Sequence, residues 1–509
     1  MRTKLNLLLT ALILQLAVLA QLHDHSNGLC GTHTLGPEQE TWLRAFQQRP
    51  YYQKIQSRSQ TLKSIPLSIH IVGDDAGDGY YDIEDLLHSM CIINQHYAQA
   101  NFLFYIKGEI EYINNSEYYD HDYNAGRQMM NNHNVDSTVN VYFCRQAVEG
   151  NCGYFDYYGD AVAITNGCQQ GDATTLTHEL GHFLSLPHTF SGWEGRSYDE
   201  NPLPENRRER QNRVNCTWTG DGFCDTPPDY HSERWNCPYS FGYVDPAGVA
   251  IETDGSLFMS YSNDACQSSF SQEQIEAMHA NVEEVRRDLI QSQEIEALTL
   301  DVPQLVYPYA NAYDVPENYV VFGWDPVEGA DQYHIQVTTR FGSFNALMID
   351  EILDINYMVN TTDFLFDKTY KYRVRAISKG TYCTDFSEER EFTIYAPAYE
   401  VDDSWNIWLE DSTTQEDSTT HINPSHEVEL KVYPNPANNQ ELLTIVADFR
   451  GLDLAQIEVR DITGRLMINQ SQQVSPSTYL VDVKSLDSGI YFINMQFGTK
   501  IMSQKILID

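Results

Sequence analysis

Three histidines lie at a spacing that could hold a metal ion. His178, His182 and His188 stand at relative positions 0, 4 and 10 in the segment T-H-E-L-G-H-F-L-S-L-P-H, residues 177–188. Residues four apart share one helix face, so the first two histidines can direct ring nitrogens at one ion. Because Pro187 prevents the helix from continuing, the chain must turn, and His188 can return as a third ligand.

The residue after the first histidine, Glu179, adds proton chemistry. Three protein ligands on Zn²⁺ leave one position for water, whose pKa then falls to about 7, so it becomes a nucleophile at neutral pH. Glu179 is predicted to be the general base, and then the acid that protonates the leaving amine. The alternative is that His178 and His182 are merely satisfied polar residues on a helix, and the offset of His188 argues against it.

A helix must carry these side chains, with strands around it. Leu176, Leu180, Phe183 and Leu184 are predicted core contacts of that helix, and Asp172 its N-cap. Hydrophobic periodicity predicts the neighbouring elements: strands at 66–72, 102–113 and 138–143, and helices at 38–48, 81–98 and 271–290. This order predicts an α/β upper subdomain and an irregular lower one, with the cleft between them.

A second group of residues makes a family resemblance specific. The histidine segment, then G-D-G-F-C-D-T-P at 220–227, then F-M-S-Y-S-N-D-A-C at 258–266, resembles the pappalysin/cytophagalysin metzincin zinc peptidases in residues and order. The resemblance implies that Met259 forms a Met-turn beneath the metal and that Tyr261 donates to the carbonyl oxygen as it gains charge. The family has glycine where this chain has Ser185, at a helix exit that needs a left-handed backbone. Serine can adopt it at a cost of about 1 kcal/mol.

The resemblance also indicates how substrate is held. Gly153–Ile164 corresponds to the antiparallel edge strand that binds extended substrate in metzincins. Asp264 corresponds to the wall of the pocket on the primed side of the scissile bond, and a carboxylate there would favour a basic residue.

Cys30 is the candidate zymogen switch. The segment L-C-G-T at 29–32 resembles the prosegment cysteine of this family, whose thiolate occupies the open zinc position, although the usual preceding arginine is absent. The alternative is that Cys30 is half of a disulfide. Four basic residues between 49 and 63 are consistent with prosegment removal, or simply with a solvated face.

The other cysteines and a group of oxygen donors suggest cross-links and a second metal. By resemblance Cys216 pairs with Cys237 and Cys224 with Cys266, although sequence alone leaves three pairings open. Three cysteines between 144 and 168 are candidates for one more bridge. Asp221, Asp225 and Thr226 carry oxygens suited to Ca²⁺, or they form a satisfied turn.

Length and charge limit the class of protein. A chain of 509 residues predicts three or four domains. The net charge of −40, from 72 acidic and 32 basic residues, argues against nucleic-acid binding and against anionic membranes.

Residues 1–20 have the basic start and short apolar run of a signal peptide. No later segment is apolar enough to span a bilayer, so the mature protein is expected to lack a transmembrane segment. The cysteines then belong to an oxidising compartment.

The expected domain order is a signal peptide at 1–20, a prosegment at 21–60, an α/β metzincin catalytic domain at 61–292, and two all-β immunoglobulin-like sandwiches separated by an acidic linker at 397–428. The first sandwich, 300–396, resembles a fibronectin type III domain, with Trp324 in its core and a tyrosine-corner strand at 366–374; a spacer role is favoured over a binding module. The second, 429–509, has V-Y-P-N-P and G-I-Y-F motifs and resembles the sorting domain of the bacterial type IX secretion system.

These features predict a secreted zinc endopeptidase that cleaves extracellular proteins or peptides and is made as a latent zymogen. The sorting domain implies a gram-negative bacterium, passage through the periplasm, the type IX machinery as a partner, and release or attachment at the outer surface. The alternative is a surface adhesin with a vestigial metal site. Glu179 argues against the adhesin, because a structural zinc site needs no adjacent carboxylate.

Overall fold

The computed structural model describes residues 29–32, 35–50, 62–148, 150–290, 295–308, 310–315, 320–344, 347–360, 364–365, 367–394, 430–433, 442–447, 454–461, 465–469, 472–475, 478–497 and 500–508. The expected signal peptide, the acidic linker and Pro434–Pro436 of the Y-P-N-P motif lie outside these residues. The chain divides into two compact units. The first comprises residues 1–300 with 377–384, and the second comprises 301–376 with 385–509.

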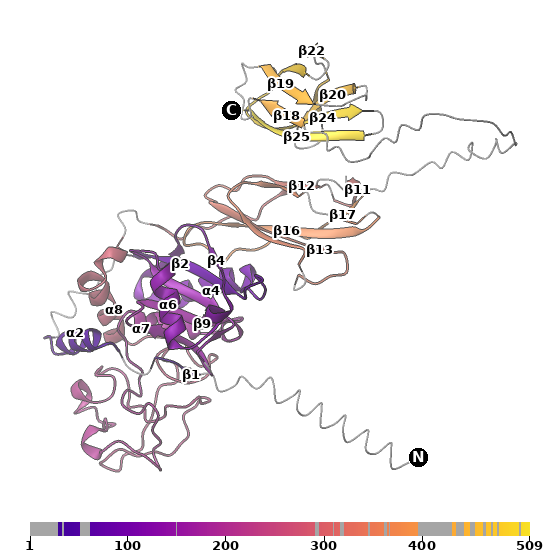
Figure 1. Ribbon diagram of the computed structural model, residues 1–509. Helices are drawn as coiled ribbons and strands as arrows, with labels where there is room; N and C mark the ends of the chain where they lie inside the picture. Colours follow the sequence, from indigo (N-terminus) through magenta and orange to yellow (C-terminus); the bar gives the residue numbers. More distant parts are fainter. Residues whose placement is uncertain are drawn as a thin grey trace, which may run out of the picture. The chain divides into compact units, whose positions relative to one another are not determined.

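A seven-stranded sheet organises the first unit (Figure 1). Its order is β1-β8-β9-β6-β2-β3, with β4 also pairing with β2. The strands are β1 Leu29–Cys30, β2 Lys63–Gly73, β3 Phe102–Ile106, β4 Glu111–Asn114, β6 Val139–Cys144, β8 Asn151–Asp156 and β9 Ala161–Thr165. All neighbours are parallel except β8 and β9. Strand β1 therefore extends the sheet along the β8 edge.

Helices cover both faces of this sheet. Tyr97 of α4 packs edge-on against Phe104 of β3, whereas Met129 and Met130 of α6 join the cluster that contains Tyr142 of β6 on the opposite face. The histidine helix α7 packs against β8 and β9. The helices are α2 Pro37–Gln47, α4 Ile83–Tyr97, α5 Ser116–Tyr119, α6 Tyr123–His133, α7 Thr175–Phe183 and α8 Gln272–Glu284, and a two-stranded sheet joins β5 Asp120–His121 to β7 Gln146–Ala147.

Four predicted elements need correction. The strand expected at 102–113 is two strands, β3 and β4, because the chain turns through Gly108 at φ 83°. Gly153–Ile164 is a hairpin of β8 and β9, with β8 toward the sheet edge. The closing helix stops at Glu284, short of residue 290. Asp172 is not the N-cap of the histidine helix: that position is Thr174, and the Asp172 carboxylate instead pairs with a histidine of α4, His88.

The disulfides differ from the expected pairing. The expected pairs Cys216–Cys237 and Cys224–Cys266 are wrong, and the bridges are Cys216–Cys224 and Cys237–Cys266. A short loop after the 3-10 turn at Cys216–Trp218 returns Cys224 to a Cα–Cα distance of 5.1 Å, within disulfide reach. Backbone bonds between residues 235 and 261–263 hold the second pair at 6.2 Å.

Two further bridges lie in the first unit. The expected bridge among the three cysteines from 144 to 168 is Cys152–Cys168, and Cys144 remains a buried thiol. Cys91 of α4 is joined to Cys383, which the sequence analysis did not anticipate. Cys383 belongs to the turn 377–384, where the Tyr382 hydroxyl also accepts from the Ile106 amide of β3, at 2.9 Å.

The second unit is all β. Residues 305–394 form a three-stranded and a five-stranded sheet from β10 Leu305–Tyr307, β11 Ala312–Val315, β12 Val320–Trp324, β13 Gln332–Thr339, β14 Ile349–Leu353, β15 Tyr357–Asn360, β16 Thr369–Ile377 and β17 Arg390–Ile394. Trp324 is buried against Tyr333, as expected for a core tryptophan. The Tyr370 hydroxyl accepts from the Leu365 amide five residues upstream, at 2.9 Å, in the manner of a tyrosine corner.

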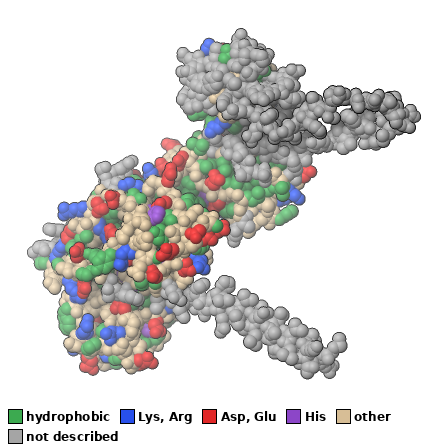
Figure 2. Space-filling view, viewed as in Figure 1, with side chains coloured by type: hydrophobic (Ala, Val, Ile, Leu, Met, Phe, Trp, Pro, Cys, Tyr) green, Lys and Arg blue, Asp and Glu red, His purple; other side chains and the backbone are tan. Residues whose placement is uncertain are grey.

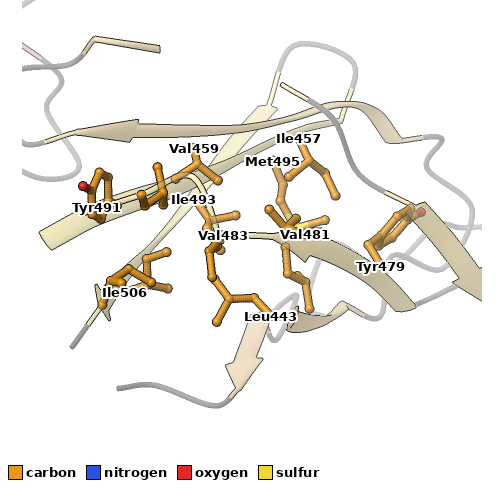
Figure 3. Close-up of a cluster of buried hydrophobic side chains, with 13 residues drawn as sticks. Leu443, Ile457, Val459, Tyr479, Val481, Val483, Tyr491, Ile493, Met495 and Ile506 are labelled. Atoms are coloured by element: carbon orange, nitrogen blue, oxygen red, sulfur yellow. The ribbon is translucent and has the colours of Figure 1, made fainter. Parts of the chain in front are cut away.

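The C-terminal strands form two four-stranded sheets. Their inward residues make one buried cluster, in which Leu443 and Val481 of one sheet face Val459 and Ile493 of the other (Figure 3). The strands are β18 Leu430–Tyr433, β19 Leu442–Ala447, β20 Leu454–Asp461, β21 Leu466–Ile468, β22 Gln472–Ser475, β23 Thr478–Asp482, β24 Gly489–Phe497 and β25 Lys500–Ile508.

On the face of the first unit drawn in Figure 2, acidic side chains are scattered among hydrophobic and other residues rather than gathered in one patch. Among the residues described, none of the helices combines the length and apolar character needed to cross a bilayer.

Candidate active site

The histidines converge at the end of α7. The Nε2 atom of His182 lies 3.1 Å from Nε2 of His178 and 3.1 Å from Nε2 of His188. Their opposite nitrogens are held by the protein: Nδ1 of His178 and of His182 each lie 2.7 Å from a backbone carbonyl, of Phe258 and Leu186 respectively. If these Nδ1 atoms carry the protons, the Nε2 lone pairs are free to face one point.

This donor set fits a zinc ion. Nitrogens bound tetrahedrally at about 2.0–2.1 Å from one zinc ion lie about 3.3 Å apart, close to the spacing seen here. Burial lowers the pKa of His178 to about 4, and burial with the two neighbouring imidazoles lowers that of His182 well below its ordinary value. Both rings are therefore neutral, the state in which imidazole binds metal.

The helix exit explains how His188 returns. Ser185 has φ 70°, so the left-handed backbone expected of this serine is confirmed. The amides of Ser185 and Leu186 donate to the carbonyls of His182 and Gly181, each at 2.9 Å, which ends the helix and reverses the chain. The Ser185 hydroxyl is buried and accepts from Asn281 of α8 at 2.8 Å.

Met259 lies directly beneath the histidine helix. A Cβ atom at Gly181 would come within 2.4 Å of the Met259 sulfur, so the helix can approach this closely only with glycine there. The Met259 carbonyl accepts from the Thr189 amide at 3.0 Å, which ties the segment after His188 to the Met-turn.

Glu179 and Tyr261 flank the histidines. Glu179 is completely buried, and burial raises the pKa of its carboxyl to about 7. Its Oε2 atom accepts from the Thr32 hydroxyl at 3.2 Å. The Tyr261 ring lies 5.0 Å from the His188 ring, and its hydroxyl donates to the Cys30 carbonyl at 3.2 Å.

Cys30 reaches the same point from strand β1. Its Sγ atom and one ring nitrogen of each of the three histidines lie within 4.8 Å of one another. It is a free, buried thiol rather than half of a disulfide. Burial, and then the nearby Glu179 carboxylate, raise the pKa of the Cys30 thiol well above its usual value. Strand β1, which carries Cys30, is held against β8: Cys30 is in register with Gly153, and the Gly31 amide donates to the Gly153 carbonyl at 2.8 Å.

Helix α2 provides further contacts near the histidines and with α8. Gln39 donates to the Ser185 hydroxyl at 3.3 Å, and Gln47 donates to the Asp221 carbonyl at 2.8 Å. Arg49, just after the helix, makes two bonds of 2.6 and 2.7 Å to the carboxylate of Glu284.

The oxygen donors expected near calcium are only partly brought together. The Thr226 hydroxyl donates to Asp221 at 2.9 Å, but the Asp225 carboxylate is engaged elsewhere, accepting from Ser271 and from the Glu273 amide at the start of α8. A residue that the sequence analysis missed, Glu209, contributes a second buried carboxylate, and the Oε1 atom of Glu209 and the Oδ2 atom of Asp221 lack hydrogen-bond partners among the described residues.

Asp264, which was expected in the wall of the primed-side pocket, is engaged by two other side chains. Its Oδ1 atom accepts from the Thr174 hydroxyl at 2.7 Å and from the Arg234 guanidinium at 2.8 Å. Arg234, Glu209, Gln39 and Thr32 were not predicted as site residues. No local motif marks the first three, and Thr32 was visible only as the last residue of L-C-G-T.

Comparisons with known proteins agree on the class of the catalytic unit. Residues 128–283 match the family described as Pregnancy-associated plasma protein-A, and residues 431–509 match the secretion system C-terminal sorting domain. An extracellular metalloprotease of Arthroderma gypseum is 26% identical over 227 residues, covering 41% of this chain and 69% of that protein. One from Colletotrichum graminicola is 24% identical over 295 residues, covering 54% and 95%.

Solved structures superpose only weakly. A Tannerella forsythia promirolysin variant gives a TM-score of 0.36 at 18% identity, covering 52% of this chain and 97% of that one. The fn3 domain of human contactin 1 gives 0.17 at 16% identity, covering 21% and 92%. The sequence matches, together with the converging histidines, establish the class: this chain carries a catalytic domain of the pappalysin family of metzincins and a C-terminal secretion sorting domain, and it is a secreted zinc metalloendopeptidase.

Proposed function

We propose that His178, His182 and His188 hold the zinc ion and that Glu179 handles the protons of peptide hydrolysis. The observation that carries this proposal is the convergence of three Nε2 atoms beside a buried carboxylate. Zinc, when bound there, acts as a Lewis acid that lowers the pKa of water and polarises the scissile carbonyl.

The chain's own groups perform the remaining steps. The carboxylate of Glu179, which lies beside the three histidines, can take a proton from water and then give one to the leaving amine. The Tyr261 hydroxyl, free once the Cys30 carbonyl has left, donates to the substrate oxygen as charge develops on it. Met259 supports the floor of the site without contacting substrate.

Cys30 holds the unprocessed protein latent in this proposal. Its thiol lies within 4.8 Å of a ring nitrogen of each histidine and would take the place of water on a bound zinc ion, and the Cys30 carbonyl engages Tyr261. The neighbouring Thr32 engages Glu179, so the prosegment contacts both proposed catalytic side chains at once. Removal of residues up to about 60 would free the water position on zinc, the Tyr261 hydroxyl and the Glu179 carboxylate.

A calcium ion is proposed for the two buried acids. Burial and the charge of Asp221 raise the pKa of Glu209 to about 9, as expected of carboxylates without a cation. Thr226 and nearby carbonyls can complete an oxygen shell, whereas Asp225 is occupied at the start of α8.

The sorting domain also suggests how the protein is exported and where it ends up. The sorting domain supports transit through the periplasm, use of the type IX machinery, and release or attachment at the outer surface of a gram-negative cell. The two all-β parts, 300–396 and 429–509, are proposed to be immunoglobulin-like sandwiches, the first acting as a spacer rather than as an adhesin.

The direct test replaces Glu179 with alanine. Zinc content, measured by atomic absorption, should stay at one ion per chain, while peptide cleavage falls to a trace, because the ligands remain and the proton carrier is lost. Loss of zinc, or cleavage at more than a trace, would show that the roles are assigned wrongly. His182→Ala is the matched control and should lose both zinc and activity.

A further inference from the structure

A small cavity beside the histidines has Arg234 in its wall. The cavity, about 30 Å³, is lined by Arg234 together with His178, Glu179 and Tyr261, and in the unprocessed chain also by Cys30. In the proposed mechanism, departure of Cys30 would open it toward the scissile bond. Asp264, from which a preference for basic substrate residues was expected, is not among the described residues that line it.

Arg234 is held in this position by the backbone. The Trp235 amide donates to the Tyr261 carbonyl at 3.1 Å, and the Asn263 amide donates to the Trp235 carbonyl at 2.8 Å. The Cys237–Cys266 disulfide ties the same two segments together. Arg234 and Asp264 therefore face each other from two chain segments that are joined both by backbone hydrogen bonds and by a disulfide.

The charge of Asp264 is already engaged. One of its oxygens accepts from both Thr174 and Arg234, and the Arg234–Asp264 pair is only about one-third exposed. The guanidinium has five N–H donors, and Asp264 is bonded to Nη2, one of its three nitrogens. A second carboxylate could therefore bind the remaining donors, whereas a basic side chain would bring its charge against Arg234.

We infer that Arg234 makes this pocket select an acidic side chain, aspartate or glutamate, next to the scissile bond, and that Asp264 serves to hold Arg234 rather than to bind substrate. This inference rests on the proposed metal site. A charge-assisted contact of this kind is worth about 1.5–3 kcal/mol, which corresponds to a preference of roughly tenfold or more over a neutral residue.

The test uses the full chain after prosegment removal and a set of otherwise identical peptides. These carry glutamate, glutamine, leucine or arginine directly after the scissile bond. For the natural protein, kcat/KM should be highest for glutamate, roughly tenfold above glutamine, and lowest for arginine. In Arg234→Gln the advantage of glutamate over glutamine should disappear, and arginine should gain because Asp264 is released.

Two variants serve as controls. Arg234→Lys keeps the positive charge and should keep glutamate ahead of arginine, even if Arg234→Gln folds poorly. Arg340→Gln removes a half-exposed arginine paired with Glu391 in the second unit and should leave every ratio unchanged.

Three results would overturn the inference: a natural protein that prefers arginine or leucine, an unchanged glutamate-to-glutamine ratio in Arg234→Gln, or loss of the glutamate preference in Arg234→Lys. Failure to cleave any peptide in the set, with zinc bound, would overturn the proposed catalytic site as well. Cleavage with the wrong preference would overturn this inference alone.

Discussion

Ser185 combines two opposing contributions to stability that substitution can separate. Its backbone lies at φ 70°, which costs a residue with a Cβ atom about 1 kcal/mol relative to glycine. Its hydroxyl accepts from Asn281, whose other amide atom, Oδ1, has no hydrogen-bond partner among the described residues. The hydroxyl also accepts from Gln39 at 3.3 Å, but the same Gln39 nitrogen lies 3.5 Å from the His182 carbonyl and keeps that acceptor. Removing the hydroxyl therefore leaves the buried Asn281 amide without a partner on either side-chain atom, at a cost of about 1–3 kcal/mol.

Two variants should then differ by a fixed amount. Ser185→Ala keeps the left-handed strain and loses the bond, so the free energy of unfolding should fall by about 1–3 kcal/mol. Ser185→Gly loses the same bond but relieves the strain, so it should fall by only about 0–2 kcal/mol. The glycine variant should exceed the alanine variant by about 1 kcal/mol whatever the bond is worth.

Urea unfolding followed by tryptophan fluorescence measures these values. Both variants are made in a Glu179→Ala background to prevent self-cleavage, and the transition of the first unit is identified by its shift on adding Zn²⁺. Equal stability of the two variants would show that Ser185 is not strained. A glycine variant more stable than the parent by 1 kcal/mol or more would show that the Asn281 bond contributes nothing.

Three other predictions concern latency, calcium and export. Cys30→Ala should give measurable peptidase activity in the unprocessed protein without loss of stability, because the thiol is buried beside the three histidines and is not in a disulfide. Thiol counting on the denatured protein should find Cys30 free. Recovery of Cys30 in a disulfide would contradict the switch. In the folded state the pKa of Glu209 is about 9, whereas in the unfolded chain it is the ordinary 4.5. Between these two pH values the folded state therefore binds one more proton than the unfolded chain. Without Ca²⁺, the free energy of unfolding should fall as pH rises through this range. Glu209→Gln or added Ca²⁺ should flatten that slope in thermal scans, and a slope unchanged by both would refute the proposed cation site. A chain ended before Val432 should remain active but accumulate in the periplasm, which cell fractionation tests; normal amounts outside the cell would contradict the sorting role.

The convergence of the three histidines could be predicted from the sequence because most of its determinants are local. His178 and His182 share a helix face, and the turn forced by Pro187 brings back His188, so local geometry brings the three rings together. The distant contact from the Phe258 carbonyl, which holds Nδ1 of His178, could not be predicted in this way. The strands and helices around them follow from hydrophobic periodicity for the same reason. The boundaries that failed, such as the break at Gly108, depend on a single backbone conformation that periodicity does not record.

The determinants that were missed come from distant parts of the chain. Arg234 meets Asp264 only because residues 234–235 pair with 261–263, and Glu209 meets Asp221 only through the irregular lower subdomain. The disulfide pairing failed likewise, since three pairings of four cysteines are compatible with the sequence and loop paths choose among them. Gln39 reaches Ser185 from a prosegment helix 146 residues earlier.

The bridge between Cys91 and Cys383 has a consequence for biosynthesis. Its two cysteines are separated by 292 residues, and the second belongs to a turn that follows strands β10–β16. A nascent chain can therefore build the histidine site well before it can close this cross-link. A recombinant protein ended at residue 300 would leave Cys91 without its partner and would also lack the Tyr382 contact to β3. The first unit is thus discontinuous in the gene, and its last cross-link can close only after the ribosome has passed residue 383.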